Sequence, residues 1–270
     1  WDDYVQYAVD RNLYGIENLS GIPGTVGGAV VANIGAYGAQ CSDAFVGADA
    51  LDLKSADLNK KKFTKDDCLF AYHESVFGHE RERYVVTRAR FALRKHAGQI
   101  AEYVDNRFRI GGETKEGTVP SLKILREQIL SVREQKGSLS TPGHASFLCA
   151  GSFFHMPFVS REEYAHVLAR AKEIDPEKEE RLRPWAWEQS DGRYKLAPGF
   201  LLEYTPYEKG YRNGEVGISP CHTLTIINHG RGTAQEVSLL ADDMQEAVQK
   251  LFAVSLEREV EYVGDISSLQ

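Results

Sequence analysis

A glycine-rich stretch at residues 20–28 constrains the fold of this chain more than any other segment. Its sequence is SGIPGTVGG, and it is followed by a second glycine-containing stretch at residues 33–38. Glycine permits positive φ angles and a close approach of the backbone to a ligand, and consecutive backbone N–H groups can cradle a pyrophosphate. The spacing matches neither GxGxxG nor a Walker loop, which argues against a Rossmann or P-loop site. Two interpretations stay open at this point: a phosphate or cofactor loop, or a tight turn that lets a helix pack on a sheet.

The composition sets broad limits on the class of protein. The chain has 270 residues, of which 42% are hydrophobic and 26% are charged, so it can form one large domain or two medium ones. A net charge of -7 argues against a nucleic-acid partner. No apolar run approaches the roughly 20 residues of a membrane span, and no leader pattern opens the sequence, so we expect a cytoplasmic protein without a membrane partner. The four cysteines, Cys41, Cys68, Cys149 and Cys221, form no CxxC pair, so we expect no metal site.

The hydrophobic patterns predict a mixture of strands and helices. Residues 45–53 and 84–91 alternate with period two, which is typical of strands, and residues 259–264 suggest one last short strand. The lysines at 60–62 suit a solvated sheet edge. Ser160 with Glu163 and Thr233 with Glu236 have the spacing of capping boxes, which predicts a helix after each pair. We expect two helices to bury their apolar sides, one through Ile124, Leu125, Ile129, Leu130 and Val132, and the other through Leu239, Leu240, Met244, Val248 and Leu251.

Residues 15–29, followed by 33–38, resemble the signature of the UDP-N-acetylenolpyruvoylglucosamine reductase family. Residues 68–77, 150–157, 195–203 and 256–264 resemble further motifs of that family, in the same order. The resemblance implies an α+β fold. Its first part is the second half of a FAD-binding domain of the vanillyl-alcohol-oxidase (PCMH-like) type, at residues 1–140, with a substrate loop near 96–120. An α+β substrate-binding domain follows at 141–258, and residues 259–270 form a strand that returns to the flavin domain.

The beginning of the sequence suggests a truncation. Trp1 falls inside a helical pattern that has Asp2 or Asp3 as its cap. The family has a glycine-serine loop for the FAD diphosphate in a preceding segment, and nothing similar occurs here. We therefore expect that an N-terminal segment has been removed.

The resemblance implies a flavin-dependent oxidoreductase with FAD and NADPH as cofactors. It implies reduction of UDP-N-acetylenolpyruvoylglucosamine to UDP-N-acetylmuramate in peptidoglycan precursor synthesis, by a monomer whose partner is a small nucleotide-sugar substrate. In the family, the glycine-rich stretches wrap the isoalloxazine and pyrophosphate of FAD. The matching positions are Ser20, Gly21, Ile22, Pro23, Gly24, Thr25, Gly27, Gly28, Asn33, Gly35, Ala36, Tyr37 and Gly38.

The resemblance also implies catalytic residues. Ser152 matches the serine that protonates C2 of the substrate, and Glu259 matches a glutamate beside the enolate. Without the resemblance, Ser152 would be interpreted as a turn residue and Glu259 as an exposed strand carboxylate. His73 stands where the family has an arginine next to the reacting carboxylate. The substrate-binding positions are Tyr72, Ser75, Tyr103 and Lys136.

Four positions depart from the family pattern around the expected site. His73 replaces the arginine, and it carries a positive charge only when protonated and lacks the guanidinium fork. Gly78 replaces a lysine, Met156 an asparagine and Tyr204 a glutamine. Losing one aimed hydrogen-bond donor from such a site costs about 100-fold to 1,000-fold in rate. Two hypotheses follow: a divergent enzyme in which His73 acts as imidazolium, or a degenerate homologue that binds a nucleotide sugar or flavin without catalysis.

Overall fold

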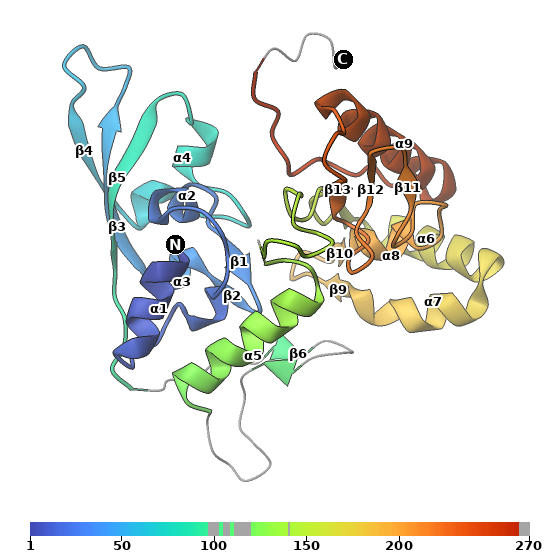
Figure 1. Ribbon diagram of the computed structural model, residues 1–270, viewed down its shortest axis with the longest axis horizontal. Helices are drawn as coiled ribbons and strands as arrows, with labels where there is room; N and C mark the ends of the chain where they lie inside the picture. Colours follow the sequence, from blue (N-terminus) through green and yellow to red (C-terminus); the bar gives the residue numbers. More distant parts are fainter. Residues whose placement is uncertain (97–102, 105–108, 111–119, 140, 265–270) are drawn as a thin grey trace. The chain divides into compact units, whose positions relative to one another are not determined.

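The chain folds into two compact units, Trp1–Glu134 and Gln135–Gln270. A computed structural model describes residues 1–96, 103–104, 109–110, 120–139 and 141–264 (Figure 1). Each unit has its own large hydrophobic core and combines helices with small antiparallel sheets. The expected α+β character is therefore confirmed. The expected substrate loop near 96–120 lies largely outside the described residues.

A three-stranded antiparallel sheet forms the framework of the first unit (Figure 1). Strand β3 (Phe45–Asp52) lies between β4 (Lys60–Thr64) and β5 (Tyr84–Phe91). Ala48 and Ala50 of the central strand are fully buried. The three consecutive lysines lie on the edge strand β4, as predicted, where charged side chains discourage pairing with another sheet.

Short helices and turns surround this sheet. Helix α2 (Val26–Val31) packs against β5 so closely that a Cβ on Gly27 would lie 3.2 Å from the carbonyl oxygen of Val86. The other elements of the unit are α1 (Asp2–Asp10), η1 (Glu17–Leu19), β1 (Gly35–Ala36), β2 (Ala39–Gln40), α3 (Cys41–Ala44), η2 (Asp66–Cys68), α4 (Val76–His79), β6 (Tyr103–Val104), β7 (Arg109–Ile110) and α5 (Leu122–Gln135).

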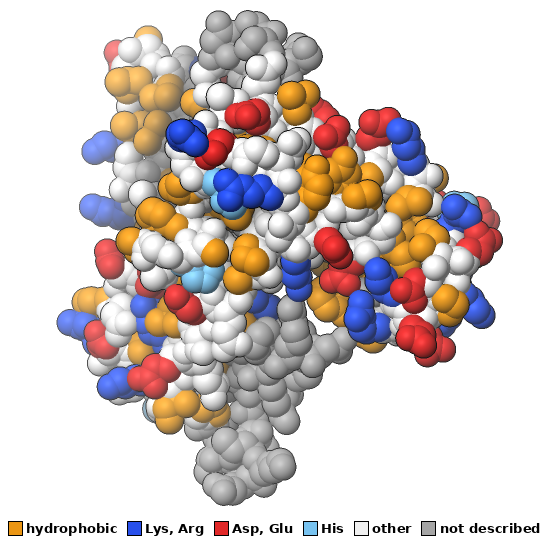
Figure 2. All heavy atoms as spheres, turned by 45° about the vertical axis from the view of Figure 1, so that its right-hand side comes forward, with side chains coloured by type: hydrophobic (Ala, Val, Ile, Leu, Met, Phe, Trp, Pro, Cys, Tyr) orange, Lys and Arg blue, Asp and Glu red, His pale blue; other side chains and the backbone are white. Residues whose placement is uncertain are grey.

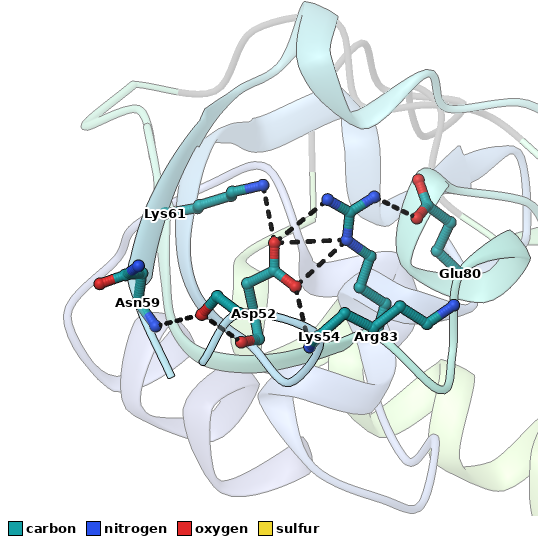
Figure 3. Close-up of polar contacts among 7 residues, drawn as sticks. Asp52, Lys54, Asn59, Lys61, Glu80 and Arg83 are labelled. Carbon is teal, nitrogen blue, oxygen red and sulfur yellow. Dashed lines mark hydrogen bonds and ion pairs between the residues drawn. The ribbon is translucent and has the colours of Figure 1, made fainter. Parts of the chain in front are cut away.

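A buried carboxylate fixes the end of β3 (Figure 3). Asp52 is 2% exposed and accepts hydrogen bonds from the side chain of Arg83 and from the backbone N–H of Lys54, and its carboxylate lies 2.7 Å from the ammonium group of Lys61. Arg83 also binds Glu80. The hydrogen bonds from Arg83 and Lys61 hold the pKa of Asp52 below its ordinary value, so this carboxylate is ionised at neutral pH. The network joins β4 and the loop before β5 to the central strand.

The second unit contains two small antiparallel sheets with helices packed beside them (Figure 1). One sheet has the order β8 (Phe158–Val159), β10 (Tyr194–Leu196), β9 (Ala186–Glu188). The other has the order β11 (Arg212–Asn213), β12 (Val216–Ile218), β13 (Ile226–Asn228). The helices are α6 (Arg161–Ile174), α7 (Pro176–Leu182), η3 (Arg183–Trp185), α8 (Pro198–Leu202) and α9 (Ala234–Phe252). Helix α9 packs against β12, β13, α6 and α8.

Both predicted capping boxes are present. The hydroxyls of Ser160 and Thr233 accept from the backbone N–H groups of Glu163 and Glu236, whose carboxylates accept from the cap residues in return. The predicted inward faces are correct in part: Leu240, Met244 and Val248 of α9 and Leu125, Ile129 and Val132 of α5 are buried. Leu239 and Ile124 were also predicted to face the core. These two predictions are wrong, because the residues are 55% and 49% exposed. Each stands next to a buried position and lies beyond the side of its helix that meets the core.

The strand predicted at residues 259–264 is not formed. Val260 and Tyr262 are partly buried against the core and alternate with exposed residues, as in a strand. Within the described part of the chain, the segment around it makes one bridge, between Arg258 and Phe154. The alternation is therefore real, but a strand also needs a paired neighbour along its length.

Charges of both signs are distributed over the molecular surface. On the face shown in Figure 2, acidic and basic side chains are interspersed with hydrophobic ones, without one large patch of a single sign. The described helices include none that is both long and apolar enough to cross a bilayer.

Candidate active site

The glycine-rich stretch forms an exposed turn that leads into α2. Gly21 and Gly24 have φ angles of 73° and 109°, a region that residues with a side chain rarely adopt. Thr25 caps α2 by accepting a hydrogen bond from the backbone N–H of Gly28 at 3.0 Å. Pro23, Gly24, Thr25 and Gly28 are exposed, whereas Ala29 and Val30 are buried. The stretch therefore forms a tight turn that packs α2 on the sheet, as one of the two interpretations expected, and its role as a phosphate or cofactor loop stays a prediction.

A salt bridge between distant segments positions this turn. Asp2 or Asp3 was predicted as the helix cap, but Trp1 is the cap residue, and both aspartates lie in the first turn of α1. The Asp2 carboxylate accepts from the backbone N–H of Gly21 at 2.6 Å and from both terminal nitrogens of Arg126 on α5, at 2.6 and 2.7 Å. Partial burial opposes ionisation of Asp2, but these hydrogen bonds outweigh it and lower the pKa. No local pattern predicted this arrangement, because Arg126 lies far along the chain.

The second glycine-containing stretch forms a hairpin. Strands β1 and β2 pair through Gly35 with Gln40 and Ala36 with Ala39. Tyr37 and Gly38 form the two-residue turn, with φ angles of 50° and 77°, as the right-handed twist of a hairpin favours. The backbone carbonyl of Tyr37 accepts from the side chain of Asn18 at 2.8 Å. The hairpin therefore has a defined conformation that its own turn residues produce.

Asn33 was predicted to contact the cofactor, and its side chain is used inside the protein. It is 1% exposed, donates to the carbonyl of Ala71 at 2.7 Å and to Gln40 at 3.2 Å, and accepts from the backbone N–H of Ser42 at 3.0 Å. These bonds join the hairpin to the segment that carries Tyr72 and His73. The arrangement favours a structural role for this amide, and its contact with a cofactor stays a prediction.

Tyr72 and His73 occupy a tight turn next to that hairpin. The turn is closed by two backbone hydrogen bonds between Ala71 and Glu74, at 3.1 and 3.2 Å. His73 has a φ of 55°, and its ring lies edge-on to that of Tyr72 with 4.4 Å between centroids. Histidine is among the residues that tolerate this left-handed conformation. Tyr72 is 39% exposed, so its ring is available at the surface of the unit.

Ser75 was predicted to bind substrate, but it is fully buried. Its hydroxyl donates to the carbonyl of Val31 at 2.6 Å and accepts from the backbone N–H of Gly78 at 3.2 Å, which caps α4. A Cβ on Gly78 would lie 3.2 Å from the same Val31 carbonyl, so a lysine would crowd this position. The geometry favours a structural role for Ser75, which holds the turn of Tyr72 and His73 against the end of α2.

In the second unit, backbone hydrogen bonds join two segments that are distant in sequence, one carrying Ser152 and the other carrying Glu259. The backbone N–H of Glu259 donates to the carbonyl of Phe153 at 2.9 Å, and that of His155 donates to Glu257 at 2.9 Å. Phe154 and Arg258 form the bridge between these bonds. Ser152 directly precedes the residue that binds Glu259. The side chain of Ser152 is exposed, and that of Glu259 is 37% exposed.

The other predicted residues have different surroundings. Lys136 is half-buried and follows the end of α5, and Tyr103 lies in the short strand β6. Met156 packs against the core of the second unit. Tyr204 packs against Phe200 and Phe252, and burial raises its pKa to about 12. At this departure from the family pattern, the side chain is therefore part of the hydrophobic core.

Comparison with known proteins identifies the family. A family model described as "UDP-N-acetylenolpyruvoylglucosamine reductase, C-terminal domain" matches residues 143–263. The UDP-N-acetylenolpyruvoylglucosamine reductase of Thermobifida fusca is 35% identical over 266 residues, which cover 98% of this chain and 72% of the relative. The reductase of Pseudomonas aeruginosa is 36% identical over 260 residues, 96% of this chain and 71% of the relative.

The chain belongs to the UDP-N-acetylenolpyruvoylglucosamine reductase family. The resemblance stated from the sequence motifs is thereby confirmed, and family membership makes an oxidoreductase function the expectation for this chain. The crystal structure of the family member from Thermus caldophilus has a TM-score of 0.57 at 22% identity and covers 96% of this chain and 68% of that protein. At this identity the likeness shows a shared fold. The roles of the individual residues in this reductase family member stay predictions.

Proposed function

We propose that the protein is an NADPH-dependent flavoenzyme that reduces UDP-N-acetylenolpyruvoylglucosamine to UDP-N-acetylmuramate for peptidoglycan precursor synthesis. One observation carries the proposal: Ser152 and Glu259, which match the family's motif positions, lie on two segments that backbone hydrogen bonds join to each other. A proton donor and an adjacent carboxylate are the groups that reduction of an enolpyruvyl double bond requires, because addition of a hydride generates an enolate.

The glycine-rich turn supports binding of FAD by the first unit. Gly24 has open space where a Cβ would lie, and Pro23, Thr25 and Gly28 beside it are exposed. A planar cofactor with a diphosphate can approach such a backbone closely. Bound FAD would supply the hydride-transfer chemistry that links NADPH to C3 of the enolpyruvyl group. The bond that Gly21 donates to Asp2 holds the turn itself, and the bonds of Ser75 and Asn33 hold the end of α2 and the neighbouring hairpin.

The proposed acid step is carried out by the second unit. The Ser152 hydroxyl gives its proton to C2 of the substrate as the electron pair of the former double bond collects there. Glu259 lies on the neighbouring segment. Its carboxyl group returns a proton to the serine and thereby neutralises the negative charge left on the serine oxygen. Partial burial raises the pKa of Glu259, which allows this group to hold a proton closer to neutral pH than an ordinary glutamate does.

A non-catalytic homologue is the second candidate, and the departures favour it. His73 replaces a permanently charged arginine, and Tyr204 is packed among core aromatic rings where the family has a polar glutamine. Such a protein would bind flavin or a nucleotide sugar without turnover.

The experiment that separates the two candidates follows the flavin of the protein expressed from its complete natural reading frame. The enzyme should be yellow and should oxidise NADPH catalytically when the enolpyruvyl substrate is present. UDP-N-acetylglucosamine, which lacks the enolpyruvyl group, is the matched control and should support no turnover. A yellow protein that NADPH reduces but that the substrate never reoxidises would favour the non-catalytic candidate. A colourless protein would reject the flavoenzyme.

A further inference from the structure

A histidine that the sequence motifs left unassigned stands next to the predicted active-site glutamate. His155 occupies the variable position of the motif that contains Ser152. Its Nδ1 atom lies 3.9 Å from Oε2 of Glu259. The two side chains are 35% and 37% exposed, so both are held partly out of water.

The backbone fixes this neighbourhood. Phe154 and Arg258 form an antiparallel bridge, and the hydrogen bonds from Glu259 to Phe153 and from His155 to Glu257 lie on either side of it. Residues that flank a bridge diagonally share one face of an antiparallel pair and stay within reach of each other's side chains. The strand register therefore puts His155 and Glu259 on the same face of the pair.

Burial and the charge of His155 act on Glu259 in opposite directions. Partial burial raises the pKa of Glu259, and the positive charge that His155 can carry acts in the opposite direction. The other titratable groups on this segment are Glu257, Arg258, Glu261 and Tyr262. Among these, the guanidinium group of Arg258 binds Tyr262 and Asp242 on α9.

We propose that His155 is a positioning residue whose positive charge favours the carboxylate form of Glu259, so that the two side chains form an imidazolium–carboxylate pair. The pair itself is a property of the second unit, and only its catalytic consequence rests on the proposed function. A positive charge on His155 opposes the effect of burial on Glu259. His155 thereby lowers the pH up to which Glu259 keeps its proton.

The test measures the titration of the Glu259 carboxyl group by carbon-13 NMR of the whole chain, without substrate or flavin. Glu259→Gln identifies the resonance by its disappearance. His155→Gln removes the positive charge but keeps a polar side chain, and it should raise the Glu259 midpoint by about 0.5 pH unit, or about threefold in its protonation constant. His155→Lys keeps a positive charge and should leave the midpoint at or below that of the parent.

The matched control is His166→Gln on α6, an exposed histidine of the same unit, which should leave Glu259 unchanged. The proposal is overturned if His155→Gln leaves the midpoint in place. It is also overturned if His155→Lys raises the midpoint equally, because the effect would then be steric.

A second measurement separates this proposal from the proposed function. The rate at which substrate reoxidises the reduced flavin should decline at a higher pH in His155→Gln than in the parent, because Glu259 then keeps its proton to a higher pH. The NMR shift without any turnover supports the pair and rejects the enzyme. Turnover with no NMR shift supports the enzyme and rejects the pair.

Discussion

The two units use their motif residues in opposite ways. In the first unit, the polar side chains of Asn33 and Ser75 are buried and bound to the protein's own backbone, while backbone atoms of the glycine-rich turn are exposed. In the second unit, backbone hydrogen bonds hold the segments together, and the side chains of Ser152 and Glu259 remain accessible. A family motif can therefore contain side chains that are buried in the protein's own structure or side chains that stay accessible to a ligand.

The largest effect is expected for the substitution Ser152→Ala. Since the serine side chain is exposed and is proposed to donate a proton, its loss should slow reoxidation of the reduced flavin by substrate about 100-fold to 10,000-fold. Reduction of the flavin by NADPH should stay nearly unchanged, and the free energy of unfolding should change by less than about 0.5 kcal/mol. Stopped-flow absorbance and urea denaturation measure these quantities. Equal loss in both half-reactions would remove the proton-donor role.

The opposite outcome is expected for Asn33→Asp. This change keeps the acceptor for the Ser42 N–H but turns the donors that face Ala71 and Gln40 into acceptors. The free energy of unfolding at neutral pH should fall by about 2–3 kcal/mol. The new carboxyl group should have a raised pKa in the folded state. The destabilisation should therefore lessen as the pH falls through that pKa and increase above it. A free energy of unfolding at neutral pH equal to that of the parent would contradict a structural role for Asn33.

A smaller loss of stability is expected for Ser75→Ala. The substitution removes one bond to Val31 and the side-chain cap of α4, which should cost about 1–2 kcal/mol. If the role is only structural, the KM for the nucleotide sugar should stay within about twofold of the parent under conditions in which the variant is folded. A large rise in KM with unchanged stability would restore the substrate-binding role that the motif implied.

The smallest effect is expected at His73. This residue lies in the first unit, and its ring contacts the exposed ring of Tyr72. If its imidazolium replaces the family's arginine, substrate reduction should decline as the pH rises and the imidazolium loses its proton. His73→Arg should flatten that decline. At the higher pH values, its rate should exceed that of the parent by up to about tenfold. His79→Gln, at a second histidine of the same unit, is the control. A pH profile that His73→Arg leaves unchanged would remove His73 from the mechanism.

Much of the local structure could be predicted from the sequence. The capping boxes of α6 and α9, the alternating strands β3 and β5, and the lysines of the sheet edge are all present. These features depend on interactions within a few residues, so a short window of sequence contains their cause. The errors at Ile124 and Leu239 arose at the margins of helical faces, where the shape of the neighbouring core decides burial.

The sequence by itself determined the family, the turns that need glycine and the residues that could serve as acid and base. Tertiary structure alone decided which of those residues are buried, that Asp2 and Arg126 hold the glycine-rich turn, and that residues 259–264 have the alternation of a strand without its ladder. It also placed His155 beside Glu259. The physical reason is the same in each case. A hydrogen bond or ion pair between distant segments forms only when the chain's packing brings them together, and the amino-acid order near either partner carries no signal of it.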